Sequence, residues 1–185
     1  METTLKKNAA RLAILSVGIG MGILFIASFA SPTHLHLANA QQNKTLIQSN
    51  DVEENNKALV LKAFDTLFNQ RDYVAAESYW SPKYIQHSAH IEPGREGLFN
   101  LVKSSPPTLK YEPDTIVADG DFVIVHGRFS GMGQPVNWIA ADILRIKDGI
   151  MVEHWDVIQD EATQEQSKSG HPMFGDNFPN PSENE

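Results

Sequence analysis

The clearest alternation of apolar and polar residues along the chain lies in residues 138–159. Two apolar-rich runs there flank Lys147-Asp148-Gly149, a sequence of the kind that tight turns prefer. Alternating runs on both sides of a short turn are typical of a β-hairpin. We therefore predict a long hairpin, and its register decides which polar side chains face the protein interior.

Two turns are compatible with this hairpin. A three-residue turn with Gly149 in the left-handed conformation places Asp142 opposite His154. A two-residue Asp-Gly turn places Asp142 beside Glu153 instead and buries two like charges. Because a buried, unpaired carboxylate costs free energy, the pattern favours the three-residue turn.

One face of this hairpin is apolar except for three polar residues. In the favoured register that face comprises Trp138, Ala140, Asp142, Leu144, Ile146, Ile150, Val152, His154, Asp156 and Ile158. Polar groups on a buried face must be hydrogen-bonded or must line a cavity. Asp142, His154 and Asp156 therefore indicate a pocket beneath the hairpin.

The preceding part of the chain shows helical spacing first and strand patterns afterwards. Apolar residues recur at helical intervals in residues 55–69 and 95–103, and Asp72 is a suitable N-cap for a short helix over residues 73–80. Strand patterns occupy residues 84–87, 108–118 and 122–129. This order predicts an α+β fold, a cone-shaped and strongly bent antiparallel sheet with three helices packed on its concave face.

The N-terminal 40 residues have the features of a secretory signal peptide. Basic residues up to Arg11 precede a charge-free apolar run over residues 12–30, and Ala38-Asn39-Ala40 offers a cleavage site. The apolar run is also long enough for an uncleaved membrane anchor. Either interpretation places the folded part outside the cytoplasm, as a secreted or periplasmic protein or as an anchored one.

These signals divide the chain into four parts, which are a signal peptide or anchor (1–40), a flexible leader (41–52), a folded domain (53–160), and a C-terminal flap with a disordered tail (161–185). Without residues 1–40 the net charge falls from −8 to −10, because the segment carries three basic residues and one acidic residue. Such an acidic chain is a poor partner for nucleic acid or an anionic membrane surface. The absence of cysteine excludes disulfides and thiolate chemistry.

Several short segments carry a more specific pattern. They are YIQH at residues 84–87, ADILR at 141–145, DG at 148–149, VEHWDVIQ at 152–159, and Met173-Phe174. Together they resemble the SnoaL-like polyketide cyclase family of the nuclear-transport-factor-2-like superfamily, and within it a subgroup predicted to act in aldol condensation. The resemblance covers about residues 53–174 and implies the fold predicted above, but it does not imply one reaction.

The superfamily also contains ketosteroid isomerases. The resemblance places His87 where their carboxylate base lies, and Asp142 and Arg145 match the segment that carries their acidic oxyanion-hole residue. Histidine in place of the carboxylate, and the lack of a clear match for the oxyanion tyrosine, argue against steroid isomerase activity. Tyr73 and Tyr84 are the tyrosines nearest to such a match.

The candidate site suits proton transfer next to a carbonyl group. Such chemistry needs a base with a pKa near neutrality and a donor for the enolate oxygen. Our hypothesis assigns His87 as the base, Asp142 as the acid or oxyanion partner, and His154 as the residue that orients or shuttles the proton. No cofactor is expected. The residues expected to bind the substrate are Phe64, Phe99, His126, Trp138, Leu144, Asp156 and Ile158.

Three other functions are compatible with the sequence. A metal site could form if His87, His90, His126, Asp142, His154 and Asp156 converge, since imidazole and carboxylate suit zinc or iron. The domain could also bind a small molecule, or assemble with other proteins, without catalysis.

The outward face of the hairpin, with Ile139, Ile143, Trp155 and Val157, is apolar enough to predict a homodimer through the convex face of the sheet.

Overall fold

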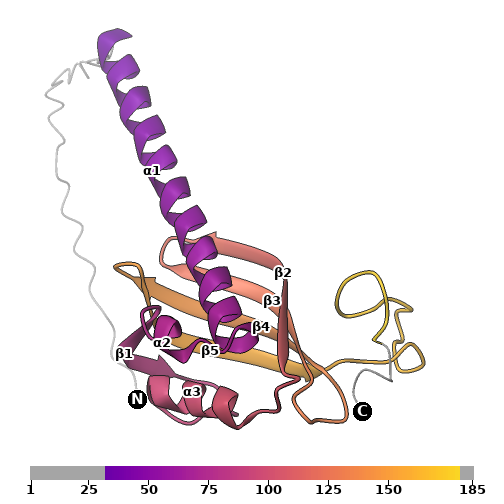
Figure 1. Ribbon diagram of the computed structural model, residues 1–185. Coiled ribbons are helices and arrows are strands. Elements are labelled where there is room, and N and C mark those ends of the chain that lie inside the picture. The colour runs from indigo at the N-terminus through magenta and orange to yellow at the C-terminus, as the bar shows by residue number, and fades with distance from the viewer. Residues whose placement is uncertain (1–31, 180–185) are drawn as a thin grey trace, which may run out of the picture. The chain divides into compact units, whose positions relative to one another are not determined.

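The computed structural model describes residues 32–179 of the chain (Figure 1). The chain divides into two units, residues 1–38 and 39–185, and the fold discussed below belongs to the second. Most of the expected signal peptide or anchor therefore lies outside the described residues. None of the described helices is long and apolar enough to span a membrane.

The described elements follow the predicted order of helices and strands. The helical elements are α1 (Pro32–Phe64), the π-helical turn η1 (Asp65–Asn69), α2 (Tyr73–Ala76) and α3 (Gly94–Ser104). The strands are β1 (Trp80–Gln86), β2 (Lys110–Asp119), β3 (Phe122–Ser130), β4 (Trp138–Lys147) and β5 (Ile150–Asp160). Asp72 caps α2 as expected, because its side chain accepts a hydrogen bond from the Ala75 N–H.

Helix α1 starts much earlier than the sequence indicated. Residues 41–52, which were expected to form a flexible leader, are helical and exposed to solvent. Residues 33–64 contain no glycine or proline, and pairs such as Glu54–Lys57 (2.7 Å) support the exposed helix. The end of the helix and η1 bury the residues expected there at helical spacing, namely Val60, Ala63, Phe64 and Leu67.

The five strands form one mixed sheet in the order β1-β5-β4-β3-β2 (Figure 1). Strands β2 to β5 pair antiparallel, as predicted, whereas β1 pairs parallel to β5. The alternation of side chains encodes the buried face of a strand but not the direction of its neighbour, so the parallel pair was not predicted. The inner face of the sheet and the helices share one core, which includes Trp80, Phe99 and Tyr111.

The predicted turn of the hairpin is wrong. Asp148 and Gly149 both have positive φ angles (53° and 74°), and Lys147 pairs directly with Ile150, which defines a two-residue turn. Together with a one-residue bulge in β5, this turn places Asp142 opposite Asp156 and not opposite His154.

A β-bulge in β5 keeps Glu153 away from Asp142 despite the two-residue turn. Ile146 pairs with Met151, but Arg145 already pairs with Glu153, so β5 carries one extra residue at this point. The bulge sends Glu153 to the outer face, where its carboxylate meets the Arg145 guanidinium at 2.7 Å. Met151, rather than Ile150 or Val152, is the buried residue here, and the inward positions His154, Asp156 and Ile158 are preserved.

The chain after β5 contacts the sheet without forming a further helix or strand among the described residues. The Glu161 side chain is buried and binds the Arg128 guanidinium, and the Asn137 amide donates to Glu161 Oε2 at 2.9 Å. The ring of Phe174 lies 4.8 Å from the Arg128 guanidinium carbon. The last six residues of the expected tail lie outside the described residues.

Candidate functional site

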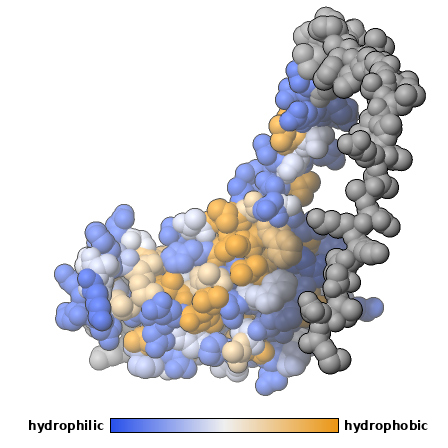
Figure 2. Space-filling model, turned by 180° about the vertical axis from the view of Figure 1, so that it is seen from behind, coloured by the Kyte–Doolittle hydropathy of each residue, from blue (hydrophilic) through white to orange (hydrophobic). Residues whose placement is uncertain are grey.

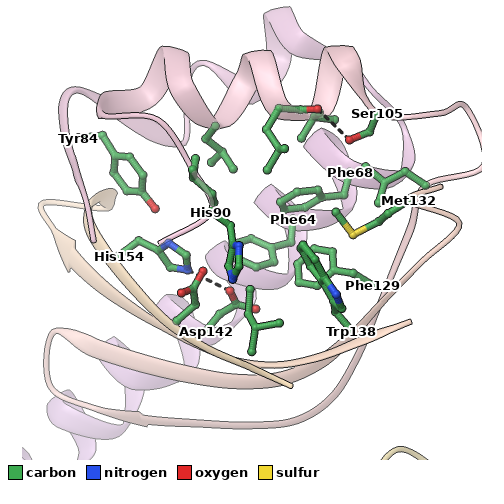
Figure 3. Close-up of a pocket in the computed structure, with 17 residues that line it drawn as sticks. Phe64, Phe68, Tyr84, His90, Ser105, Phe129, Met132, Trp138, Asp142 and His154 are labelled. Atoms are coloured by element: carbon green, nitrogen blue, oxygen red, sulfur yellow. Dashed lines mark hydrogen bonds and ion pairs between the residues drawn. The ribbon is translucent and has the colours of Figure 1, made fainter. Parts of the chain in front are cut away.

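An apolar pocket lies between the helices and the inner face of the sheet, with an empty volume of about 570 Å³ that is partly open to solvent (Figure 3). Polar groups from β4 and β5, with His90 from the loop before α3, interrupt a mostly apolar lining. The lining residues are Phe64, Phe68, Tyr84, His90, Ile91, Leu98, Leu101, Val102, Ser105, Leu109, Phe129, Met132, Trp138, Asp142, His154, Asp156 and Ile158.

Asp142 and His154 form the buried polar pair of this pocket. The Nε2 atom of His154 lies 2.9 Å from Asp142 Oδ1, and only 6% and 4% of the two side chains are exposed. On the far side of the ring, His154 Nδ1 lies 2.8 Å from Gln86 Oε1. A continuous hydrogen-bonded chain therefore runs from β1 through β5 to β4 and ends at the pocket.

The second oxygen of Asp142, Oδ2, has no hydrogen-bond partner among the described residues, although it is buried. Burial raises the pKa of Asp142 above its usual value, the His154 hydrogen bond and charge oppose this rise, and the carboxylate of Asp156 adds to it. Asp156 is the cross-strand partner of Asp142 and is only half-buried. The pocket therefore combines a carboxyl group whose pKa is raised with a second carboxyl group beside it.

Two tyrosines lie close to the polar end of the pocket. Burial raises the pKa of both Tyr84 and Tyr111, and the charge of Asp142 contributes in each case. Both phenols therefore stay protonated around neutral pH. The Tyr111 hydroxyl is buried without a hydrogen-bond partner among the described residues, and its ring covers Gly127 on β3.

Six of the residues expected at the site line the pocket together. They are Phe64, Trp138, Asp142, His154, Asp156 and Ile158. Leu144 and Phe99 do not, because both are fully packed in the core: Leu144 is inaccessible to solvent, and the ring of Phe99 meets Trp80 edge-on. The expectation that these two side chains line the pocket is wrong.

The expectation that His87 shares the pocket with Asp142 is also wrong. The His87 ring stacks on Trp155 with 4.7 Å between ring centroids, and its Nε2 lies 2.9 Å from the Glu153 carboxylate on the outer face of the sheet. Side chains alternate along β1 so that Tyr84 and Gln86 point inward. His87, one residue further along, consequently points outward.

His126 lies on the outer face as well. Its Nδ1 is 3.4 Å from the Asp114 carboxylate, and its ring is 5.9 Å from that of Phe174. The inward row of β3 is Val123, Val125, Gly127 and Phe129, not the row of Phe122, Ile124 and His126. Both rows are apolar, so alternation by itself could not choose between them.

Sequence reasoning missed Gln86, and it named His90 only as a possible metal ligand. Gln86 could have been found from the same YIQH segment, since Tyr84 and Gln86 share one face of the strand and Tyr84 is the residue that belongs in a core. His90 lies in a loop, where no periodicity marks its direction. Its ring meets Trp138 with 5.2 Å between centroids.

The six-residue convergence considered for a metal ion does not occur, because His87 and His126 are on the outer face. Within the described part of the chain, one oxygen or nitrogen atom from each of Asp142, His154 and Asp156 lies within 4.8 Å of the others. Two of these groups are already hydrogen-bonded to each other. Carboxylate and imidazole groups of this kind suit zinc, but they suit proton transfer equally well.

The chain matches the family model of the SnoaL-like domain over residues 60–154. This match spans more than half of the 185 residues, and the chain therefore belongs to the SnoaL-like family. The family resemblance inferred from the sequence motifs is thus confirmed. No curated protein shows significant similarity to the chain.

Solved structures that align with TM-scores of 0.50 or more confirm the α+β fold. A candidate ketosteroid isomerase from Kribbella flavida aligns with a TM-score of 0.54 at 19% identity, over 69% of this chain and 97% of that one. A candidate polyketide cyclase from Acidithiobacillus ferrooxidans aligns with a TM-score of 0.50 at 18% identity, over 57% and 88%. AclR, a candidate hydroxylase from Streptomyces galilaeus, is 29% identical over 58% and 90%, with a TM-score of 0.48.

Proposed function

We propose that the protein catalyses cofactor-independent acid–base chemistry on a small, mostly apolar carbonyl compound. The observation that carries this proposal is the Asp142–His154 pair, with its unpartnered Asp142 Oδ2, at one end of an apolar pocket. A carboxyl group with a raised pKa takes up a proton more readily than an ordinary carboxylate and can return it to the substrate. Asp142 replaces His87 as the proposed base.

The proposed reaction begins with one proton shared between His154 Nε2 and Asp142 Oδ1. A carbon next to the substrate carbonyl gives its proton to Asp142 Oδ2, and the electron pair of the broken C–H bond forms the enolate. The shared proton then moves fully to Nε2, so the pair as a whole takes up one proton. Return of that proton to another carbon of the substrate completes an isomerisation.

An aldol-type ring closure uses the same proton-transfer groups. The enolate carbon attacks a second carbonyl carbon of the same molecule, forms the new C–C bond, and leaves an alkoxide. The proton held on Asp142 is then transferred to the alkoxide, which restores the starting state. The aromatic walls Phe64, Phe129 and Trp138 suit a substrate that is flat and apolar apart from its carbonyl end.

Deuterium exchange into 2-tetralone, a bicyclic apolar ketone, tests this proposal. In D₂O the purified protein should accelerate exchange of the protons next to the carbonyl, as followed by ¹H NMR. Asp142→Asn should lower the enzyme-dependent rate at least about 100-fold. His87→Gln, at a residue on the outer face, is the control and should keep the wild-type rate.

Three other results separate the rival functions. Equal rates for wild type and Asp142→Asn would contradict the proposed base. Binding of 2-tetralone without any exchange would favour a non-catalytic ligand-binding domain. A rate that a chelator abolishes and zinc restores would favour a metal-dependent enzyme instead.

We also propose that the protein is exported and forms a homodimer. Export rests on the basic start, the apolar run over residues 12–30 and the Ala38-Asn39-Ala40 motif, of which the last lies within α1. The mass of the protein isolated from its host tests cleavage after Ala40. The dimer rests on apolar side chains that the outer face of the sheet leaves exposed.

A further inference from the structure

Gln86 is the member of the hydrogen-bonded chain Gln86–His154–Asp142 that lies farthest from the pocket. Its Oε1 atom lies 2.8 Å from His154 Nδ1 and 3.0 Å from the backbone N–H of Ser88. The backbone pairing fixes this position, because Gln86 is the register partner of His154 and the His87 N–H donates to the His154 carbonyl at 2.9 Å. The side-chain amide therefore has little freedom to move away from the imidazole.

The Ser88 contact identifies the amide atom that faces the imidazole. A backbone N–H can only donate, so the Gln86 atom beside it must be the carbonyl oxygen. The opposite orientation would bring the amide NH₂ against the Ser88 N–H, donor against donor. The observed orientation leaves Gln86 Nε2 buried without a hydrogen-bond partner among the described residues, so the amide is not placed to satisfy its own donors.

We infer that Gln86 is a positioning residue that keeps the proton on Nδ1 of His154. This inference rests on the proposed function of the Asp142–His154 pair. A carbonyl oxygen accepts but cannot donate, so His154 Nδ1 must carry a hydrogen for the 2.8 Å contact to be favourable. If the Asp142–His154 pair carries a second proton, that proton then lies in the hydrogen bond between His154 Nε2 and Asp142 Oδ1.

This tautomer decides what Asp142 can do in the pocket. With Nδ1 protonated, neutral His154 presents the Nε2 lone pair to Asp142 Oδ1, so the proton between them comes from the carboxyl group. Oδ2 is then free to accept a substrate proton while Oδ1 passes its own proton to Nε2. In the other tautomer Nε2–H donates to a simple carboxylate, and the imidazole cannot take up the transferred proton at that position.

The test compares Gln86→Leu, which removes the acceptor, with Gln86→Glu, which retains a carboxylate oxygen there. Protein labelled with ¹⁵N-histidine reports the protonation of each ring nitrogen of His154 through its chemical shift. Wild type and Gln86→Glu should show a protonated Nδ1, whereas Gln86→Leu should show an unprotonated Nδ1 and a protonated Nε2. His87→Leu, at the outward neighbour on the same strand, should match wild type.

The same variants have a functional readout. Gln86→Leu should lower kcat for deuterium exchange of 2-tetralone about 10-fold or more with little change in KM, and Gln86→Glu should restore most of it. If Gln86→Leu does not fold, Gln86→Asn withdraws the carbonyl oxygen from the imidazole and serves in its place.

Two results would overturn the inference. One is an unprotonated Nδ1 in the wild-type protein, and the other is the same His154 spectrum in wild type and in folded Gln86→Leu. The NMR result does not depend on turnover, so it stands or falls separately from the proposed enzymatic function. A protein without exchange activity but with the expected spectra would refute the proposed function alone.

Discussion

Asp142 is held in surroundings that a surface carboxylate never meets. One oxygen is bound to an imidazole, the other faces an apolar pocket without a partner among the described residues, and a second carboxyl group lies across the strand pair. A buried group of this kind costs folding free energy unless it is protonated. Its retention at the pocket therefore fits a chemical role better than a structural one.

The raised pKa of Asp142 predicts how stability changes with pH. Because its pKa in the folded state exceeds the value of 3.8 expected in the unfolded chain, the folded state binds more protons between these two values. The contribution of Asp142 to the free energy of unfolding is therefore largest at low pH and decreases as the pH rises from about 3.8 through the folded-state pKa.

Asp142→Asn removes this contribution. Relative to wild type, the variant should gain stability as the pH rises toward neutrality, as measured by urea unfolding at a series of pH values. Titrating groups that do not interact with Asp142 cancel in the difference between the two proteins. A difference that is constant with pH, or that changes in the opposite direction, would show that Asp142 has no raised pKa.

The sequence revealed those site residues that are polar although their neighbours along the strand are apolar. Asp142, His154 and Asp156 stand out within apolar strands, and all three line the pocket. The sequence could not reveal the direction of His87 and His126, because an exposed histidine on an outer face carries the same local pattern as a buried one. Both lie beside acidic side chains of neighbouring strands, and such tertiary partners leave no mark in local sequence.

At the scale of elements, the bulge in β5 links the turn to the site. The two-residue turn and the bulge together shift the pairing of β4 and β5 without changing which side chains of residues 154–158 face inward. The sequence therefore predicted most of the inner face while its register was wrong. A bulge of one residue has no composition that distinguishes it from regular strand, so it could not be read from the pattern.

Packing of β2 on β3 depends on the absence of a side chain at Gly127. A Cβ atom there would lie 2.5 Å from atoms of the Tyr111 ring, which is itself held in the aromatic core. Gly127→Ala should lower the free energy of unfolding by about 1–3 kcal/mol, because the ring must move out of its packed position. Thermal and urea unfolding measure this loss.

A double-mutant cycle identifies the cause of that loss. Truncation of the ring in Tyr111→Leu makes room for the added methyl group, so the combined variant should lose less stability than the sum of the two single variants. Strictly additive losses would show that Gly127 is needed for some other reason, such as the conformation of its own strand.

At the scale of the whole molecule, the two faces of the sheet differ in what their side chains contact. The inner face packs against the helices and lines the pocket, whereas the outer face exposes Ile85, Val117, Phe122, Ile124 and Val157. Apolar side chains gather on the side of the molecule seen in Figure 2, which is turned by 180° from the view of Figure 1. An exposed apolar surface of this kind is typical of a protein interface.

The proposed homodimer is tested at Val157, whose exposed fraction is 68%. Val157→Glu places a charge in the proposed interface and should convert a dimer of wild-type protein into monomers, as measured by light scattering. Val74→Glu is the matched control, because Val74 is even more exposed (86%) but lies on α2, away from the sheet face. A monomeric wild-type protein, or an unchanged dimer in Val157→Glu, would contradict the interface.

A kinetic double-mutant cycle tests most directly whether Asp142 and His154 act on a proton as one unit within the pocket. The rate of deuterium exchange into 2-tetralone would be measured for wild type, Asp142→Asn, His154→Gln and the double variant. Residues that act as a unit are non-additive, so the double variant should be about as slow as Asp142→Asn alone. Losses that multiply, or a His154→Gln variant with the wild-type rate, would show that the two side chains act independently.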